Sequence, residues 1–285
     1  MSTIDASFKV CALLGFPARH SMGPAIHNAA FVALGLPLVY VAHDVAPADL
    51  AAAVAGTRVI GYRGLSVTMP HKVAALSLVD EVDAMARAIG CINTVVNQDG
   101  RLVGYNSDGQ GALDALGRAG ISPRGRRVLV LGSGGAARAV AMTVAVRGQP
   151  AELEILGVVE DELVRLGRDV AERAGAVVNA RMLDDKALVA AVAQADVLLH
   201  CTPVGMTPDT AHSLVPRELL RPALAVFDAV YNPRRTLLVA QAAERGCRVV
   251  EGMEMFLGQA MVQFELWTGQ KAPAEVMRKV IEARL

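Results

Sequence analysis

Residues 126–150 of this 285-residue chain read RRVLVLGSGGAARAVAMTVAVRGQP. An apolar, β-branched run comes first, a glycine-rich turn follows at 132–137, and an alanine-rich helical run completes the stretch. The turn fits G-x-G-x-x-A, and its place between a strand and a helix is typical of a dinucleotide-binding turn. Glycines permit the sharp bend and let backbone N–H groups approach a pyrophosphate at the helix N-terminus. Because three glycines are more than a bare turn requires, the stretch predicts a nucleotide site.

The composition and net charge of the chain indicate which broad class of protein it belongs to. Hydrophobic residues make up 53% of the chain, and 28 basic side chains balance 28 acidic ones. This balance predicts a globular protein without nucleic-acid or membrane partners. The apolar runs are far shorter than the ~20 residues of a membrane span, and the N-terminus lacks the basic start of a secretion signal. The widely spaced Cys11, Cys91, Cys201 and Cys247 indicate buried thiols in a reducing compartment, so we expect a cytoplasmic protein.

Strand-like segments alternate with helical ones along most of the chain, which predicts an α/β fold. A Gly-, Pro- and Arg-rich cluster at 117–127 predicts a domain boundary, with an N-terminal α/β substrate domain at 1–118 and a second domain at 119–252. The strands expected in the first domain lie at 8–16, 38–45 and 61–69, with a hairpin at 94–105. The second domain has six more, at 127–132, 153–156, 176–183, 196–201, 225–231 and 248–252. Six strands separated by room for helices predict a doubly wound parallel sheet of the Rossmann type.

The choice between NAD and NADP depends on the tip of the second Rossmann strand. An acidic side chain there suits the ribose hydroxyls of NAD, whereas an arginine suits the extra phosphate of NADP. Residues 157–159 read GVV, with no basic side chain, and Glu160 and Asp161 follow. We therefore favour NAD, with Glu160 or Asp161 as candidate ribose contacts. Acidic residues are also favoured in the first turn of a helix for purely structural reasons.

Four polar stretches in the first domain stand out, at 18–28, 64–72, 90–96 and 104–111. Three of them follow strands, where open α/β sheets gather ligand-binding loops. Thr68 and Pro70 are expected to begin a long helix over 71–89. Lys72 would then oppose the helix dipole at a cost of ~0.3–1 kcal/mol, an environment that favours proton exchange. The alternative for Lys72 is a solvated surface lysine.

Asp108 precedes the helical run that starts at 109, so it is either an N-cap or a functional carboxylate. His20 and His27 have no third ligand nearby, and no metal site is expected.

Taken together, these stretches resemble the shikimate/quinate dehydrogenase family. The resemblance covers nearly the whole chain through eight ordered motifs. They are HSMGPAIHN at 20–28, SVTMPHK at 66–72, GCINT at 90–94, GYNSD at 104–108, HCTPVGM at 200–206, DAVYNP at 228–233, GMEMFLGQ at 252–259 and WTG at 267–269.

The resemblance implies an N-terminal substrate domain, a Rossmann domain and C-terminal helices, 253–285, that return to the first domain. It implies reversible hydride transfer between NAD or NADP and a ring carbon, linking 3-dehydroshikimate with shikimate or a related cyclic polyhydroxy carboxylate. Lys72 and Asp108 match the catalytic pair that handles the hydroxyl proton. The implied substrate residues are Ser21, Ser66, Thr68, Asn93, Tyr231 and Gln259. The implied cofactor residues are Gly132, Ser133, Gly134, Gly135, Ala136, Thr202, Pro203, Val230, Gly252 and Met255. We expect a monomer or a homodimer.

Several positions depart from the family pattern. Gly23 replaces a serine that donates to the substrate carboxylate, Ser66 replaces an asparagine, and Ser107 replaces a threonine. His200 stands where asparagine is usual, and GVV at 157–159 replaces the N-R-T that grips NADP. These changes indicate a divergent member that favours NAD. The alternatives are a quinate dehydrogenase and, from another class, a non-catalytic nucleotide-sensing protein. Retention of both Lys72 and Asp108 argues against the sensor.

Overall fold

The computed structural model describes residues 4–285 and divides into two compact units. The first unit comprises the chain up to Ser107 together with Gln259–Arg284, and the second comprises Asp108–Gly258. This division falls 11 residues before the expected boundary at 118/119, because helix α4 (Asp108–Arg118) packs on helix α5 (Gly135–Thr143). A Cβ on Gly109 would lie 2.0 Å from Thr143 Oγ1, so only glycine permits this close helix contact.

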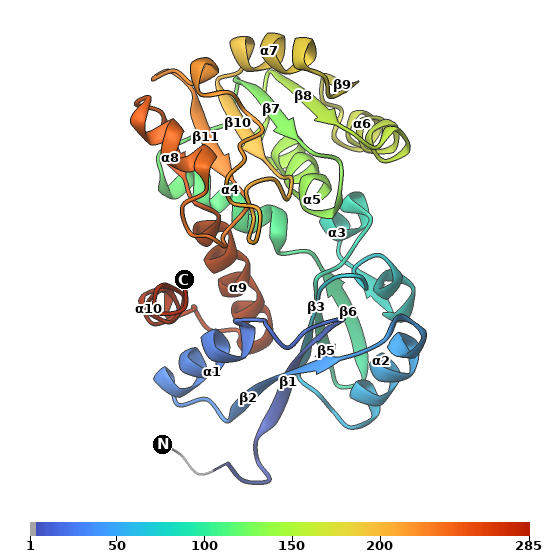
Figure 1. The fold of residues 1–285 in the computed structure, drawn as a ribbon. Coiled ribbons are helices and arrows are strands. Elements are labelled where there is room, and N and C mark those ends of the chain that lie inside the picture. The colour runs from blue at the N-terminus through green and yellow to red at the C-terminus, as the bar shows by residue number, and fades with distance from the viewer. Residues whose placement is uncertain (1–3) are drawn as a thin grey trace. The chain divides into compact units, whose positions relative to one another are not determined.

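The second unit is built on a six-stranded sheet in which every neighbouring pair is parallel (Figure 1). The strand order is β12-β11-β10-β7-β8-β9, which is the doubly wound order of a Rossmann sheet. The strands are β7 (Arg127–Leu131), β8 (Glu152–Gly157), β9 (Val178–Met182), β10 (Val197–His200), β11 (Ala225–Asp228) and β12 (Arg248–Val250). The predicted fold class and all six strands are confirmed.

Helices cover both faces of this sheet. On one face, α7 (Asp185–Gln194) and α8 (Leu237–Glu244) join a buried apolar cluster with alternate strand residues such as Leu129, Leu198 and Val226. Alternate side chains of a strand point to opposite faces, so Val128 and Val130, also buried, face the other side. Helices α4, α5 and α6 (Glu160–Ala174) pack in succession, and a π-helical turn, η3 (Val144–Gly148), ends α5. The remaining short helix is η4 (Arg217–Leu219).

The strand order reverses at β7, which pairs with β8 on one side and β10 on the other. Ligands of open α/β sheets bind at the carboxyl ends of the strands at such a reversal. The glycine turn that follows β7 lies there. Gly132 has φ +114°, and a Cβ on it would lie only 2.8 Å from the carbonyl oxygen of Cys201, which follows β10. Both the backbone conformation and the available space therefore require glycine at this position.

The first unit has a mixed six-stranded sheet of order β2-β1-β3-β5-β6-β4, in which β5 is antiparallel to both β3 and β6. Its strands are β1 (Lys9–Gly15), β2 (Leu38–Asp44), β3 (Gly64–Val67), β4 (Glu81–Val82), β5 (Thr94–Gln98) and β6 (Arg101–Tyr105). Its helices are α1 (Gly23–Ala33), η1 (Pro47–Asp49), α2 (Leu50–Val59), η2 (Ala74–Leu78), α3 (Ala84–Ile89) and α10 (Ala274–Glu282), with the end of α9 (Gly252–Thr268). The predicted hairpin is present as β5 and β6.

The C-terminal part of α9 packs on the first unit's sheet through Trp267. Its indole N–H donates to the carbonyl of Val95 at 3.0 Å. A Cβ on Gly64 would lie 2.2 Å from the indole nitrogen, so the glycine makes room for the ring. No helix within residues 4–285 is long and apolar enough to cross a membrane.

The long helix expected over 71–89 is wrong. The chain instead forms η2, the short strand β4 and the six-residue α3. Pairing of Glu81 and Val82 with β6 extends the backbone, and the Asp83 side chain then accepts from two N–H groups that start α3. Lys72 therefore lies in a turn before a five-residue 3₁₀ helix and not in the first turn of a long α-helix. The dipole of a long α-helix therefore does not act on Lys72.

An ion-paired carboxylate fastens α6 to α5, the helix that follows the glycine turn. The Asp169 side chain is 6% exposed and accepts hydrogen bonds from Arg138 and Arg168. Burial alone would raise the pKa of Asp169, but the bonds from these arginines outweigh it and hold the pKa below its usual value. Such a group stabilises the fold above its unfolded-state pKa, and the stabilisation is lost as the pH falls through the folded-state pKa.

We expect Asp169→Asn to lower the free energy of unfolding at pH 7 by about 1–3 kcal/mol, because it leaves Arg138 without its buried anionic partner. The deficit relative to wild type should shrink below about pH 4, where the carboxylate becomes protonated first in the unfolded chain and, at still lower pH, in the folded protein. Urea unfolding at several pH values measures both effects. Glu244→Gln, which breaks the exposed pair with Arg217, is the matched control and should cost less than about 1 kcal/mol. Equal losses in the two variants at pH 7 would contradict the assignment.

Candidate functional site

In the first unit, the predicted substrate residues gather at one edge of the sheet. The loops after β1 and β3 lie side by side, since the N–H of Phe16 donates to the carbonyl of Met69 and the N–H of Thr68 donates to that of Leu14. A Cβ on Gly15 would lie 2.4 Å from the Thr68 methyl group, so glycine permits this approach. The structure therefore places the Thr68 turn directly against the start of the loop that leads to Ser21.

Ser21 is held by its own loop. Its Oγ accepts a hydrogen bond from the N–H of Gly23 at 3.1 Å, which orients the hydroxyl. A Cβ on Gly23 would lie 3.2–3.3 Å from Ser21 Oγ and from the ring and hydroxyl of Tyr40. The space beside Gly23, where the family pattern has a serine side chain, is thus closely bordered by Tyr40.

Asn93 is the centre of a buried hydrogen-bond network. Its Oδ1 accepts from the Ser107 N–H at 2.8 Å and from Thr94 Oγ1 at 2.7 Å, and its Nδ2 donates to Ser107 Oγ at 3.0 Å. Hydrogen bonds at both Oδ1 and Nδ2 therefore fix the orientation of the Asn93 amide. The backbone carbonyl of Lys72 accepts from the N–H of Ile92, which brings the Lys72 turn beside the Asn93 strand.

Gln263 belongs to this network, and sequence reasoning missed it. Its Nε2 donates to Thr94 Oγ1 at 3.1 Å, and its Oε1 accepts from Ser66 Oγ at 2.9 Å. Gln259, the predicted substrate residue, lies one helical turn earlier on α9 and so on the same helix face. In the sequence, only the four-residue spacing from Gln259 could have indicated that Gln263 lies on the same side of the helix. The Ser66 hydroxyl, predicted to touch substrate, is buried and bonded to Gln263.

His27 and Tyr40 form an aromatic wall behind these residues. Their rings stack at 4.7 Å, and Trp267 lies 5.0 Å from the His27 ring. Burial lowers the pKa of His27 to about 3, which the hydrogen bond to Gln263 only partly opposes. Burial likewise raises the pKa of Tyr40 above its usual value. Both rings are thus uncharged at neutral pH, and His27 is a core residue.

The two predicted catalytic residues lie on different units. Lys72 is half-buried in the turn after β3, and Asp108 is the buried first residue of α4. Asp108 follows directly on Ser107, whose backbone and hydroxyl are both bonded to Asn93. The chain therefore delivers Asp108 from the same network that orients Asn93.

The glycine turn of the second unit has the features of a pyrophosphate site. Gly134 is the N-cap of α5 in an extended conformation, and no side chain of the described residues caps the helix. Apart from the adjoining residues and the backbone of the helix itself, no atom of residues 4–285 would lie within 4 Å of a Cβ on Gly134 or Gly135. The first N–H groups of α5 thus face open space beside side-chain-free backbone, which fits an anionic phosphate at a helix N-terminus.

Other predicted cofactor residues meet at the carboxyl ends of the neighbouring strands. A Cβ on Gly252 would lie 2.3 Å from the carbonyl oxygen of Val230, so the two backbones touch. The N–H of Val230 donates to the buried Asp228 carboxylate at 3.0 Å. Met255, one turn into α9, is buried, whereas Pro203 is exposed. Tyr231, predicted to lie near substrate, is 39% exposed and stacks on Phe256 at 4.8 Å.

The first turn of α6, which follows β8, carries an acidic residue that the sequence analysis did not single out. Glu162 accepts from the Ser133 hydroxyl of the glycine turn at 3.4 Å. A Cβ on Gly157, the last residue of β8, would lie 2.9 Å from Ser133 Oγ, so glycine permits this approach. Glu160 and Asp161, the candidates from sequence, instead border an exposed hollow on α6 together with Arg165 and Arg168. Among these three acids, Glu162 is the one bonded to the glycine turn.

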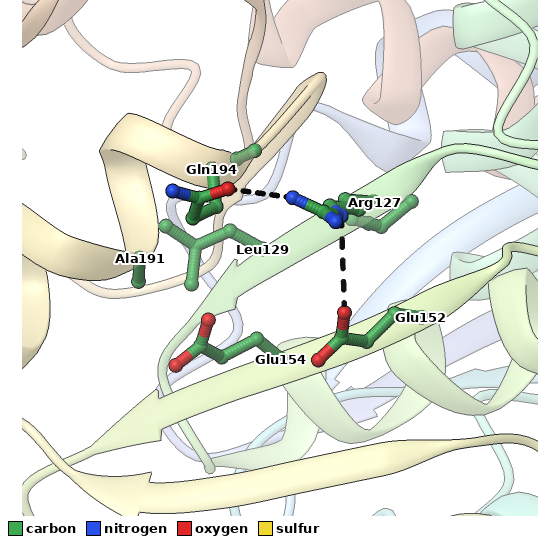
Figure 2. Close-up of a pocket in the computed structure, with 8 residues that line it drawn as sticks. Arg127, Leu129, Glu152, Glu154, Ala191 and Gln194 are labelled. Atoms are coloured by element: carbon green, nitrogen blue, oxygen red, sulfur yellow. Dashed lines mark hydrogen bonds and ion pairs between the residues drawn. The ribbon is translucent and has the colours of Figure 1, made fainter.

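Figure 2 shows a hollow at the opposite edge of the sheet, lined by Arg127, Glu152, Glu154 and Gln194. Arg127 and Glu152 are the first residues of β7 and β8, so this hollow lies at the amino ends of the strands. Its volume is about 210 Å³. Arg127 donates to Gln194 at 2.5 Å, and Glu154 pairs with Arg181. These charges neutralise one another, and the doubly wound fold binds ligands at the other edge.

Within the described part of the chain, no group of three or more His, Cys, Asp or Glu side chains could hold a metal ion. Cys11, Cys91, Cys201 and Cys247 are free and buried, as predicted. Burial raises the pKa of the Cys11 thiol to about 12.

Comparison with known proteins agrees with this geometry. Residues 13–95 match the family described as shikimate dehydrogenase substrate binding domain, and residues 252–282 match the shikimate 5'-dehydrogenase C-terminal domain. A shikimate dehydrogenase (NADP(+)) from Moorella thermoacetica is 44% identical, over 99% of this chain and 95% of the relative.

Two solved structures are similar over almost their whole length. Shikimate 5-dehydrogenase from Listeria monocytogenes, in complex with shikimate and NAD, is 32% identical with a TM-score of 0.92 and covers 99% of both chains. Quinate dehydrogenase from Corynebacterium glutamicum, in complex with NAD, is 28% identical with a TM-score of 0.90, over 97% of this chain and 99% of that one. The fold, the ordered motifs and these full-length similarities agree, and the chain belongs to the shikimate dehydrogenase family.

Proposed function

We propose that this protein is an NAD(P)-dependent dehydrogenase that interconverts 3-dehydroshikimate and shikimate, or a closely related cyclic polyhydroxy carboxylate. The single observation that carries the proposal is the buried network around Asn93, which orients a predicted ring-hydroxyl contact and holds Ser107, the residue before Asp108. A protein that merely sensed nucleotides would have no need of a lysine and a carboxylate, Lys72 and Asp108, that match the family's proton-handling pair. The full-length relatives support the same reaction.

The chain's own residues supply binding, orientation and proton transfer. Ser21 and Thr68 bind the substrate carboxylate, and Asn93 and Gln259 bind ring hydroxyls. Lys72 and Asp108 hold the reacting hydroxyl and exchange its proton. The nicotinamide, when bound, supplies or accepts the hydride. Gly132–Ala136 bind the pyrophosphate, while Thr202, Pro203, Val230, Gly252 and Met255 border the rest of the cofactor. Tyr231 contributes to the substrate side.

We infer that NAD is preferred over NADP. Residues 157–159 offer no cation to a 2′-phosphate, and Glu162 places a carboxylate against Ser133 of the glycine turn. A second negative charge there would be repelled. The relatives differ in this respect, since the Moorella enzyme is named for NADP(+) and the Listeria enzyme was solved with NAD.

Quinate is a second candidate substrate, favoured by the similarity to a quinate dehydrogenase. Shikimate and quinate both carry the carboxylate, so the serine hydroxyl that is missing at Gly23 costs either substrate about 1–3 kcal/mol of binding if nothing replaces it. We further propose a cytoplasmic location, supported by the buried free thiols. Whether the protein is a monomer or a homodimer stays a prediction.

The role of Lys72 is tested by Lys72→Ala. We expect kcat for shikimate oxidation to fall by about 10²-fold or more with KM nearly unchanged, because proton transfer is lost while other substrate contacts remain. Steady-state rates measured as NADH absorbance supply both constants. Lys186→Ala, which removes an exposed lysine of α7, should behave as wild type. An unchanged kcat in Lys72→Ala would remove the lysine from the mechanism.

The cofactor preference is tested by Val158→Arg, at a position that is 69% exposed directly after β8. A charge-assisted bond to the 2′-phosphate should raise kcat/KM for NADP relative to NAD by about 10- to 100-fold. The control Val189→Arg adds the same charge to exposed α7 and should leave the ratio unchanged. A ratio that does not move in Val158→Arg would mean that this strand tip does not face the ribose.

A further inference from the structure

His200 is buried at the end of β10 between two polar partners. The residue is 1% exposed, and its Nδ1 lies 2.8 Å from Oδ1 of Asp228 while its Nε2 lies 2.5 Å from Oγ1 of Thr202. Asp228 ends β11 and is fully buried. A continuous hydrogen-bonded chain thus runs from β11, across the end of β10, into the loop that follows β10. The family pattern has asparagine at this position, so the imidazole is a feature of this chain.

The bonds around Asp228 fix the direction of its hydrogen bond with His200. Asp228 accepts from the N–H of Val230 at 3.0 Å and from the Thr236 hydroxyl at 2.5 Å, as a carboxylate does. A carboxylate only accepts, so His200 Nδ1 carries a hydrogen and donates to it. Nε2 and the Thr202 hydroxyl form the second bond of the ring, and either group can supply its hydrogen. The Thr202 Oγ1 in turn accepts from the N–H of Val204 at 3.3 Å.

These bonds set the rotamer of Thr202, and that rotamer places its methyl group. Thr202 Cγ2 lies 3.3 Å from where a Cβ on Gly132 would be, and the Cys201 carbonyl oxygen lies 2.8 Å from the same point. The Thr202 methyl group and the Cys201 carbonyl therefore pack against the glycine turn. A different Thr202 rotamer would shift either the loop after β10 or the glycine turn.

We propose that His200 is a positioning residue for the dinucleotide site. It acts through Thr202, whose side chain it locks against the glycine turn, and so fixes both the loop after β10 and the start of α5 before the cofactor arrives. Preorganisation of this kind reduces the ordering cost of binding. The inference rests on the proposed cofactor site.

The order Asp228–His200–Thr202 is also the order of a hydrolytic triad. A triad needs N–H donors aimed at a developing oxyanion. The N–H of Val204, in the same loop, donates instead to Oγ1 of Thr202 itself. We therefore assign a positioning and not a nucleophilic role.

The test is a double-mutant cycle of His200→Ala and Thr202→Val, with NADH affinity measured by isothermal titration of the full chain. Each single variant should weaken NADH binding by about 5- to 30-fold, the range for one or two lost buried hydrogen bonds. The double variant should bind no more weakly than His200→Ala, because both changes break the same chain. At saturating cofactor and substrate, kcat should change far less than the NADH affinity does. His212→Ala, at an exposed histidine of the same loop region, is the matched control and should bind as wild type.

Wild-type affinity in His200→Ala, or losses that multiply in the double variant, would overturn the proposal. If His200→Ala does not fold, Thr202→Val decides alone, and wild-type affinity there overturns it. A wild-type protein that binds NADH but oxidises no shikimate would refute the proposed reaction and leave this titration valid. A wild-type protein that does not bind NADH would overturn both.

Discussion

The contact between Gly132 and the Cys201 carbonyl is the constraint on which the second unit's site depends. β7 and β10 are adjacent parallel strands, and the segments that follow them approach so closely that a Cβ on Gly132 would lie 2.8 Å from the Cys201 carbonyl oxygen. A residue with a Cβ would have to push the loop after β10 away from the turn. That loop carries Thr202, which is hydrogen-bonded to His200 and through it to Asp228. The absence of a Cβ at Gly132 is therefore required for the observed positions of these three side chains.

In the first unit, a network of buried polar side chains holds the candidate substrate site. Asn93, Thr94, Ser66 and Gln263 would each cost free energy if buried alone, and the structure satisfies them by bonding them to one another. This network holds the start of β5 in place, and the turns that carry Ser21, Thr68 and Lys72 adjoin it. Rigid side chains of this kind suit a reaction in which a ring hydroxyl must be held in one orientation.

The sequence predicted the Rossmann sheet well, because its strands are short apolar runs and its turn needs glycine for local reasons. It failed over 71–89, where residues with good helix propensity form β4 by pairing with β6, a non-local partner that propensity cannot reveal. Ser21, Thr68 and Asn93, which the motifs singled out, lie at one edge of the first unit's sheet. Gln263, Glu162 and the Asp228–His200 pair were missed, since each owes its role to a neighbour far away in sequence.

The most direct test of this account is the initial rate at 340 nm of the purified protein with shikimate and quinate, each offered with NAD and with NADP. We expect NADH to form from shikimate and NAD, and we expect a lower rate with NADP at equal concentration. A rate on quinate that equals or exceeds the rate on shikimate would make quinate the preferred substrate of the same hydride-transfer reaction. No absorbance change in any of the four combinations, from a protein that binds NADH, would contradict the proposed substrate.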